Sequence, residues 1–104
     1  MNSLAGLAQI MARYDSAPDP VRPSLRVSIA KLLSEADEEF DAIGDRISVR
    51  RDWLDAHRKD DPPHASYKKR RKHFYEIDSR EHAEAGELLE RGYEAITATD
   101  RKAA

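Results

Sequence analysis

The sequence predicts an all-α protein: a long antiparallel, coiled-coil-like helical hairpin plus a short N-terminal helix, which completes a three-helix bundle or, with a second copy, a dimeric four-helix bundle. Three observations predict this fold. Two segments of more than thirty residues each contain no internal proline. Apolar residues recur in both segments at the three- and four-residue steps of an α-helix. A short proline-containing turn joins the segments, which favours antiparallel neighbours in one domain, residues 1–104.

Residues 2–15 are predicted to form the short N-terminal helix. Ser3 is a candidate N-cap, because its hydroxyl can accept a hydrogen bond from a free backbone N–H of the first turn. The apolar residues that share one side of this helix are Leu4, Leu7, Met11 and Tyr14. Three prolines follow within six residues, so residues 16–23 are predicted to be a connector.

Residues 24–60 are predicted to form one long helix. Its apolar seam advances by alternating steps of four and three residues, the heptad spacing of a coiled coil. The seam residues are Ile29, Leu33, Ala36, Phe40, Ile43, Ile47, Arg50, Leu54 and His57. At 1.5 Å per residue this helix is roughly 50 Å long. Ser24 is a plausible N-cap, and a start near Asp19, which places Pro23 in the first turn, is the alternative.

Residues 61–64 are predicted to form the turn, and residues 65–98 the second long helix, with a frayed tail at 99–104. Asp61 followed by Pro62 suits an N-cap and a first helical position, because proline lacks an N–H that would be unpaired there. The predicted stripe of the second helix is Tyr67, Arg70 or Arg71, Phe74, Ile77, Glu81, Ala85, Leu88, Gly92 and Ile96.

The two stripes align when the numbers of facing residues sum to about 124. Arg50 is then expected to face Phe74. Glu81 lies in the middle of the seam opposite an isoleucine, and we expect it to pair with Arg46 or Arg50, since a charge there needs a partner.

Several large apolar residues lie off this seam, and four of them are candidate self-association residues: Trp53, Tyr75, Leu89 and Tyr93. They either cover the N-terminal helix within one chain or dock a second hairpin. The sequence favours the second interpretation, a homodimer. Gly44, Gly86 and Gly92 lie inside predicted helices, where each costs about 1 kcal/mol relative to alanine. Close approach of a neighbouring helix would explain these glycines, and neutral drift is the alternative explanation.

Charge is distributed unevenly. Ten basic and four acidic residues lie between positions 46 and 73, which gives this segment a charge of +6 before histidine. The rest of the chain has eight basic and sixteen acidic residues, a charge of −8. Since the hairpin brings both flanks of the basic segment to one end, the sequence predicts a positive tip and a negative body. The acidic stretch at 35–41 either solvates its helix or binds a basic partner.

The candidate contacts of this basic tip are Arg51, Arg58, Lys68, Lys69, Arg71 and Lys72. Lysines and arginines interleaved with tyrosine, phenylalanine and histidine can hold phosphates and stack on bases. Nucleic acid is therefore a possible partner, and a solvated helix face is the plainer interpretation. No helix-turn-helix, zinc-finger or RNA-recognition pattern is present.

No site for chemistry is predicted. The chain has no cysteine, glycine-rich phosphate loop or nucleophile elbow, and we expect no catalytic residue, cofactor or metal. Asp78 and His82 share a helix face, but no histidine has the Glu-x-x-His spacing of ferritin-like bundles. No stretch reaches the roughly 18 apolar residues of a membrane span. The expectation is a non-enzymatic cytoplasmic adaptor, assembly factor or inhibitor that self-associates and docks on a larger, unidentified partner.

Overall fold

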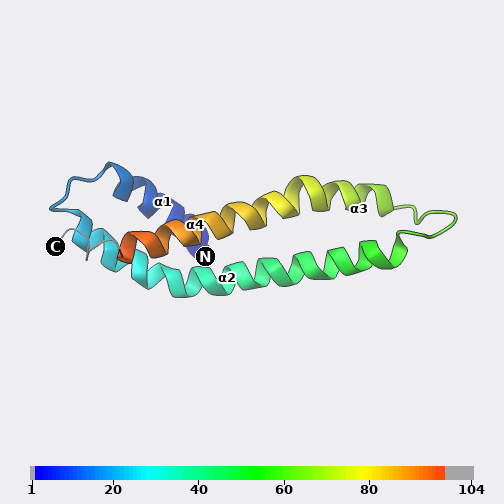
Figure 1. The fold of residues 1–104 in the computed structure, drawn as a ribbon, viewed down its shortest axis with the longest axis horizontal. Helices are drawn as coiled ribbons and strands as arrows, with labels where there is room; N and C mark the ends of the chain where they lie inside the picture. Colours follow the sequence, from blue (N-terminus) through cyan, green and yellow to red (C-terminus); the bar gives the residue numbers. More distant parts are fainter. Residues whose placement is uncertain (1, 98–104) are drawn as a thin grey trace.

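The computed structural model describes residues 2–97, which form helices with no strand among them (Figure 1). The elements are α1 (Ser3–Ser16), α2 (Arg22–His57), α3 (Tyr67–His73), the π-helical turn η1 (Phe74–Asp78) and α4 (Ser79–Thr97). The last three follow one another without a break and form a second rod antiparallel to α2. The molecule measures 63 × 24 × 19 Å. The all-α prediction is confirmed.

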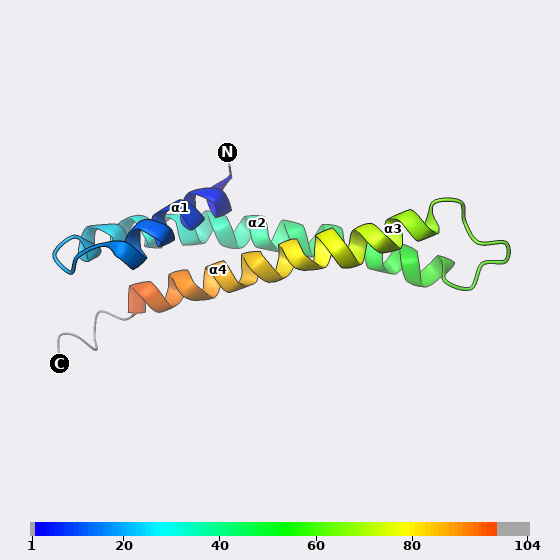
Figure 2. The same cartoon turned by 90° about the horizontal axis from the view of Figure 1, so that it is seen from above.

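The short helix α1 lies against α2 and α4 at one end of the hairpin, as Figures 1 and 2 both show. Its N-cap is Asn2, whose side chain accepts from the backbone N–H of Ala5, rather than the predicted Ser3. The core lies where the three helices meet. It consists of Leu7 and Met11 from α1, Ile29, Leu33 and Ala36 from α2, and Leu89 and Ala95 from α4.

The seam predicted on α2 is confirmed, because all nine of its residues are buried or half-buried. The helix begins at Arg22, two residues before the predicted start. Pro23 is tolerated in the first turn, where its missing N–H has no partner to lose. Ser24 is therefore not the N-cap, and its hydroxyl donates to the carbonyl of Val21.

The turn between the long helices is longer than predicted. α2 ends at His57, the next helix begins at Tyr67, and Ser66 rather than Asp61 occupies the N-cap position. An aromatic cluster accounts for the extra residues. The ring of Trp53 lies 4.3 Å from that of His57 and 5.1 Å from that of His64, so the loop folds back onto the end of α2. The predicted helix end at 98 and the tail at 99–104 lie outside the described residues.

The π-helical turn changes which residues of the second rod face α2. A π turn uses i→i+5 hydrogen bonds and so accommodates an extra residue, which shifts the stripe by about one position. Two predicted seam residues, Ile77 and Glu81, are therefore exposed, and Asp78 and His82 are turned toward α2 instead. His82 stacks on Phe40 with ring centroids 4.5 Å apart.

We call the end of the hairpin against which α1 packs the base. The register of the two long helices agrees with the prediction there. Phe40 packs beside Gly86, and Leu33 packs so closely on Gly92 that an added Cβ would lie 2.9 Å from its Cδ2 atom. Close helix approach therefore explains the glycine at 92. At Gly44 an added Cβ would meet only His82, at an ordinary 3.6 Å, so no close approach requires that glycine.

Candidate interaction surfaces of the hairpin

Two carboxylates of α2 hold the N-terminus of α1 in place. The backbone N–H of Ser3 donates to Glu39 at 2.6 Å, and its hydroxyl donates to Glu35 at 2.7 Å. Negative charge is favourable there because the first N–H groups of a helix carry partial positive charge. Part of the acidic stretch thus serves the chain itself. Beyond this point, over residues 42–84, α2 and the second rod run without a third helix among the described residues. We call residues 42–84 the arm.

A groove opens at the N-terminus of α1, where the arm begins. Its volume is about 640 Å³. The apolar residues that line it are Leu4, Ala5, Ala8, Ala42, Ile43, Ala85 and Leu88. The charged residues that line it include Glu39, Glu81, Glu84, Glu87, Arg46 and Arg91. The groove therefore combines an apolar floor with a mainly acidic rim.

A second groove, of about 490 Å³, lies farther along the arm. It is lined by Val49 and Trp53 together with Asp45 and three arginines, Arg46, Arg50 and Arg70. Arg46 lines both grooves, so the two are neighbours on the arm. Apolar surface is again present, but the charge at this end is basic.

The two grooves follow the same stripe of α2 that α1 covers at the base. Glu35 and Glu39 contact α1, and the three- and four-residue steps continue through Ala42, Arg46, Val49 and Trp53. On the second rod, Ile77 lies one turn before the groove residue Glu81. The side chains of Val49 and Ile77 are 71% and 50% exposed. We call this continuation of the α1 position along the arm the outer face.

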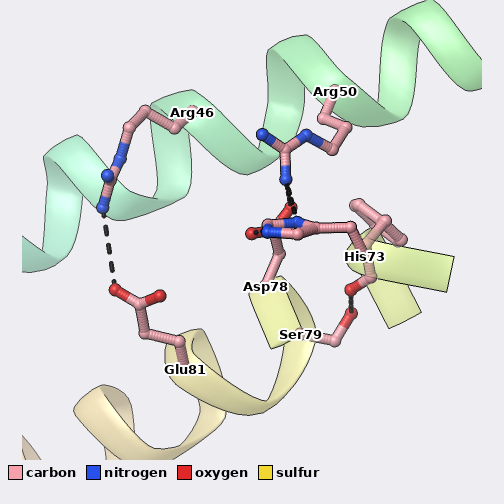
Figure 3. Close-up of polar contacts among 7 residues, drawn as sticks. Arg46, Arg50, His73, Asp78, Ser79 and Glu81 are labelled. Carbon is pink, nitrogen blue, oxygen red and sulfur yellow. Dashed lines mark hydrogen bonds and ion pairs between the residues drawn. The ribbon is translucent and has the colours of Figure 1, made fainter. Parts of the chain in front are cut away.

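Arg50 connects the two rods of the arm at the π-helical turn (Figure 3). Its guanidinium hydrogen-bonds the carboxylate of Asp78 and the ring of His73, and Asp78 also lies 3.3 Å from His73 Nδ1. The side chain of Asp78 is only 14% exposed. The hydroxyl of Ser79 donates to the carbonyl of Phe74 at 3.0 Å, which fixes the π turn. The polar partners of Arg50 thus lie on either side of Phe74, the residue that it was predicted to face.

Glu81 pairs with Arg46, one of its two predicted partners, at 3.7 Å (Figure 3). Both side chains are more than half exposed, because the π turn has moved Glu81 out of the seam. An exposed pair of this kind contributes little to stability. Among residues 2–97, no group of three or more histidine, aspartate or glutamate side chains is arranged to hold a metal ion.

The structure brings together three of the predicted basic contacts. Lys68, Arg71 and Lys72 line one shallow pocket on the second rod with Tyr75 and Glu76. The Arg71 guanidinium lies 5.1 Å from the centre of the Tyr75 ring. These three lysine and arginine residues form no ion pair within the described part of the chain. We call Lys68, Arg71, Lys72 and Tyr75 the basic face.

The other predicted basic contacts lie apart from this face. Lys69 is exposed on α3 and Arg58 in the loop after α2. Arg51 lies 3.8 Å from Asp52 and lines a pocket with Asp41 and Asp45, so it has acidic neighbours. Arg70 instead covers Trp53, with its guanidinium 4.3 Å from the centre of the ring.

The four predicted self-association residues have different surroundings. Leu89 is 6% exposed and belongs to the core that α1 completes, so its own chain already covers it. Trp53 is half-buried at the tip and lines the outer face. Tyr75 is 60% exposed on the basic face. Tyr93 is partly exposed at the base and donates its hydroxyl to Asp37.

The hydrogen bond to Asp37, followed by burial and by the negative charge of that carboxylate, raises the pKa of Tyr93 above its ordinary 10.0. A third residue of the acidic stretch, after Glu35 and Glu39, is thus engaged at the base. Asp15 pairs with Arg91 at 2.5 Å in the same region. These contacts fix the three helices of the base to one another and leave the arm as the region without a cover.

Sequence reasoning missed the outer face as a unit. Its half on α2 is readable, because the steps from Ala42 to Trp53 are helical. Its half on the second rod depends on the π turn, which no residue pattern in this sequence announces.

The chain matches no known protein family, no curated protein and no solved structure. Within residues 2–97, none of the helices combines the length and the apolar character required to cross a membrane.

Proposed function

We propose that this chain is a non-enzymatic helical interaction protein that forms a homodimer through its arm and docks on a larger partner through its basic face. The observation that carries the proposal is the exposure of Val49 and Ile77 on an arm built from only two helices. A two-helix hairpin buries one stripe per helix and gains little apolar burial alone. Exposed apolar side chains gathered on one face are typical of an interaction site.

The grooves of the arm support binding of a macromolecule better than catalysis. They lie along the surface of the hairpin, and the polar cluster between them is an ion-paired connection of one helix to the other. The charges of Arg50 and Asp78 are paired with each other, so these two groups serve to connect the helices. The base, which α1 covers, supplies the packed core, and the arm extends from it as the binding element.

Sedimentation equilibrium tests the homodimer. We expect a mass near twice the 11.8 kDa of the chain as the concentration rises through the micromolar range. Replacing Val49 and Ile77 by serine together is expected to return the mass to that of a monomer. Val27→Ser is the matched control, since Val27 is 56% exposed on α2 but lies at the base. A monomer at every concentration would overturn the proposal.

The basic face supports one second candidate, a nucleic-acid-binding accessory function. Its cations form no ion pair in the described chain, where Glu76 is the acidic residue of the same pocket, and Tyr75 offers a ring on which a base can stack. Retention on DNA or RNA is expected to weaken steeply with salt, because binding releases counterions from the phosphates. Replacing Lys68, Arg71 and Lys72 by alanine is expected to abolish retention.

The matched control for this test removes three exposed cations away from the basic face, Arg13, Lys31 and Arg80. If both triple variants reduce retention equally, only the total charge matters and the basic face is not the site. If neither variant changes retention, the nucleic-acid function is wrong.

A further inference from the structure

The outer face carries opposite charge at its two ends. Toward the tip it presents Arg70, whose guanidinium covers the ring of Trp53. Toward the base it presents Glu84 and its acidic neighbours around an apolar floor. The exposed Val49 and Ile77 lie between these ends. One face of the arm therefore has a basic end, an apolar centre and an acidic end.

We propose that the outer face pairs with the same face of a second copy in an antiparallel arrangement about a two-fold axis near Val49 and Ile77. This inference rests on the homodimer proposed above and specifies its geometry. In a two-fold interface, each contact occurs twice with the roles of the two chains exchanged. The arginine end of each arm then meets the glutamate end of the other, and the two apolar centres meet at the axis.

Charge excludes the parallel alternative. Parallel pairing places Arg70 beside Arg70 and Glu84 beside Glu84, and like charges juxtaposed across an interface are unfavourable. Antiparallel pairing places Arg70 of each chain beside Glu84 of the other, twice per dimer. A second copy satisfies this pattern because the outer face is complementary to itself when it is turned end to end.

The position of α1 is consistent with this arrangement. At the base, α1 covers the same stripe of α2 that the outer face continues. The N-terminus of α1 lies beside Glu39, where the acidic groove begins. In the proposed dimer, the tip of the second copy, with Trp53 and Arg70, covers the part of the outer face that α1 does not reach. The basic face lies on another side of α3 and remains free for the larger partner.

The dimer is expected to be weak. Between Ala42 and Trp53 the helix rises only about 16 Å, so the overlap is small compared with standard interfaces of about 800 Å² per partner. We therefore expect micromolar dissociation constants that increase with salt, since charged rims are screened.

Charge reversal tests the arrangement. Arg70→Glu and Glu84→Arg are each expected to weaken the homodimer about tenfold, because each homodimer then contains two like-charge contacts. An equimolar mixture of the two variants is expected to restore dimerisation, since both contacts of the mixed dimer pair opposite charges. Sedimentation equilibrium provides the measurement. A mixture no tighter than its components would overturn the antiparallel arrangement.

Cysteine cross-linking gives an independent measurement, and the chain has no cysteine of its own. Under mild oxidation, a mixture of Arg70→Cys and Glu84→Cys is expected to form a mixed disulfide in higher yield than either variant alone. Val27→Cys, at the base, is the control for random collision. Homodisulfides from each variant alone, in a chain that sediments as a dimer, overturn the arrangement and leave the homodimer intact. A wild-type monomer overturns both.

Discussion

Arg50 of α2 and Asp78 of the opposite rod form an ion pair at the one π-helical turn among the described residues. The π turn places Asp78 rather than Ile77 toward α2, and Arg50 is the seam residue that it meets. His73, one turn earlier, contacts the same pair. This cluster is the polar connection between the two rods of the arm.

Asp78→Asn is expected to lower the free energy of unfolding by about 1–2 kcal/mol, because it leaves the partly covered Arg50 without a charged acceptor. Urea unfolding followed by circular dichroism measures this. Glu81→Gln is the matched control, since it removes the longer and more exposed pair with Arg46, and its expected cost is below about 0.5 kcal/mol. Equal costs for both variants would contradict the special role of Asp78.

Two glycine substitutions are expected to have opposite signs. Gly92→Ala places a Cβ 2.9 Å from Leu33, whose side chain is 2% exposed and has little room to move. We expect a loss of about 1–2 kcal/mol, since overpacking outweighs the gain in helix propensity. Gly44→Ala meets no such contact and is expected to stabilise the chain by about 0.5–1 kcal/mol. The urea midpoints of the two variants measure this. A lower midpoint than that of the wild type indicates close helix approach at the substituted glycine, and a higher midpoint indicates neutral drift.

The Tyr93 hydroxyl gives a pH-dependent prediction. Because the pKa of Tyr93 is raised in the folded chain, its hydrogen bond to Asp37 contributes fully below the ordinary pKa of about 10 and is lost as the pH rises through the folded pKa. In Asp37→Asn, the Tyr93 phenol is expected to ionise at lower pH. Tyrosinate absorbance during alkaline titration measures this, with Tyr93→Phe assigning the signal. An unchanged titration in Asp37→Asn would contradict the contact.

Ser3→Ala is expected to loosen α1, because it removes the hydroxyl donated to Glu35 and leaves only the backbone bond to Glu39. A hydrogen bond to a charged acceptor contributes about 1.5–3 kcal/mol. Faster proteolysis within α1 at an unchanged rate in the arm is the expected result. Ser34→Ala, at an exposed position on α2, is the control, and equal cleavage in both variants would contradict the anchoring of α1.

The sequence predicted most of the helical framework, and the exceptions have physical causes. Periodicity gave the seam of α2 from Ile29 to His57, because apolar side chains spaced along a helix must face a common neighbour. It failed on the second rod between Phe74 and His82, since a π turn inserts a residue that periodicity does not detect. Charge counting located the basic tip, but not that Arg51 lies among acidic residues.

The candidate surfaces were predictable only in part. Trp53 and Tyr75 were recognisable as off-seam residues, and Leu89 follows the other interpretation offered for such residues, because α1 covers it in the core. Predicting the outer face requires knowing where along α2 the N-terminus of α1 lies. That position is set by the tertiary contacts of Ser3 with Glu35 and Glu39, which no local pattern specifies.

The central claim is that a second copy covers the outer face of the arm. Amide hydrogen exchange across a dilution series tests it most directly. We predict that amides of residues 42–53 and 70–84 exchange more slowly as the protein concentration rises, whereas those of α1 do not change. Exchange in the arm that is independent of concentration, across the micromolar range, would contradict the claim.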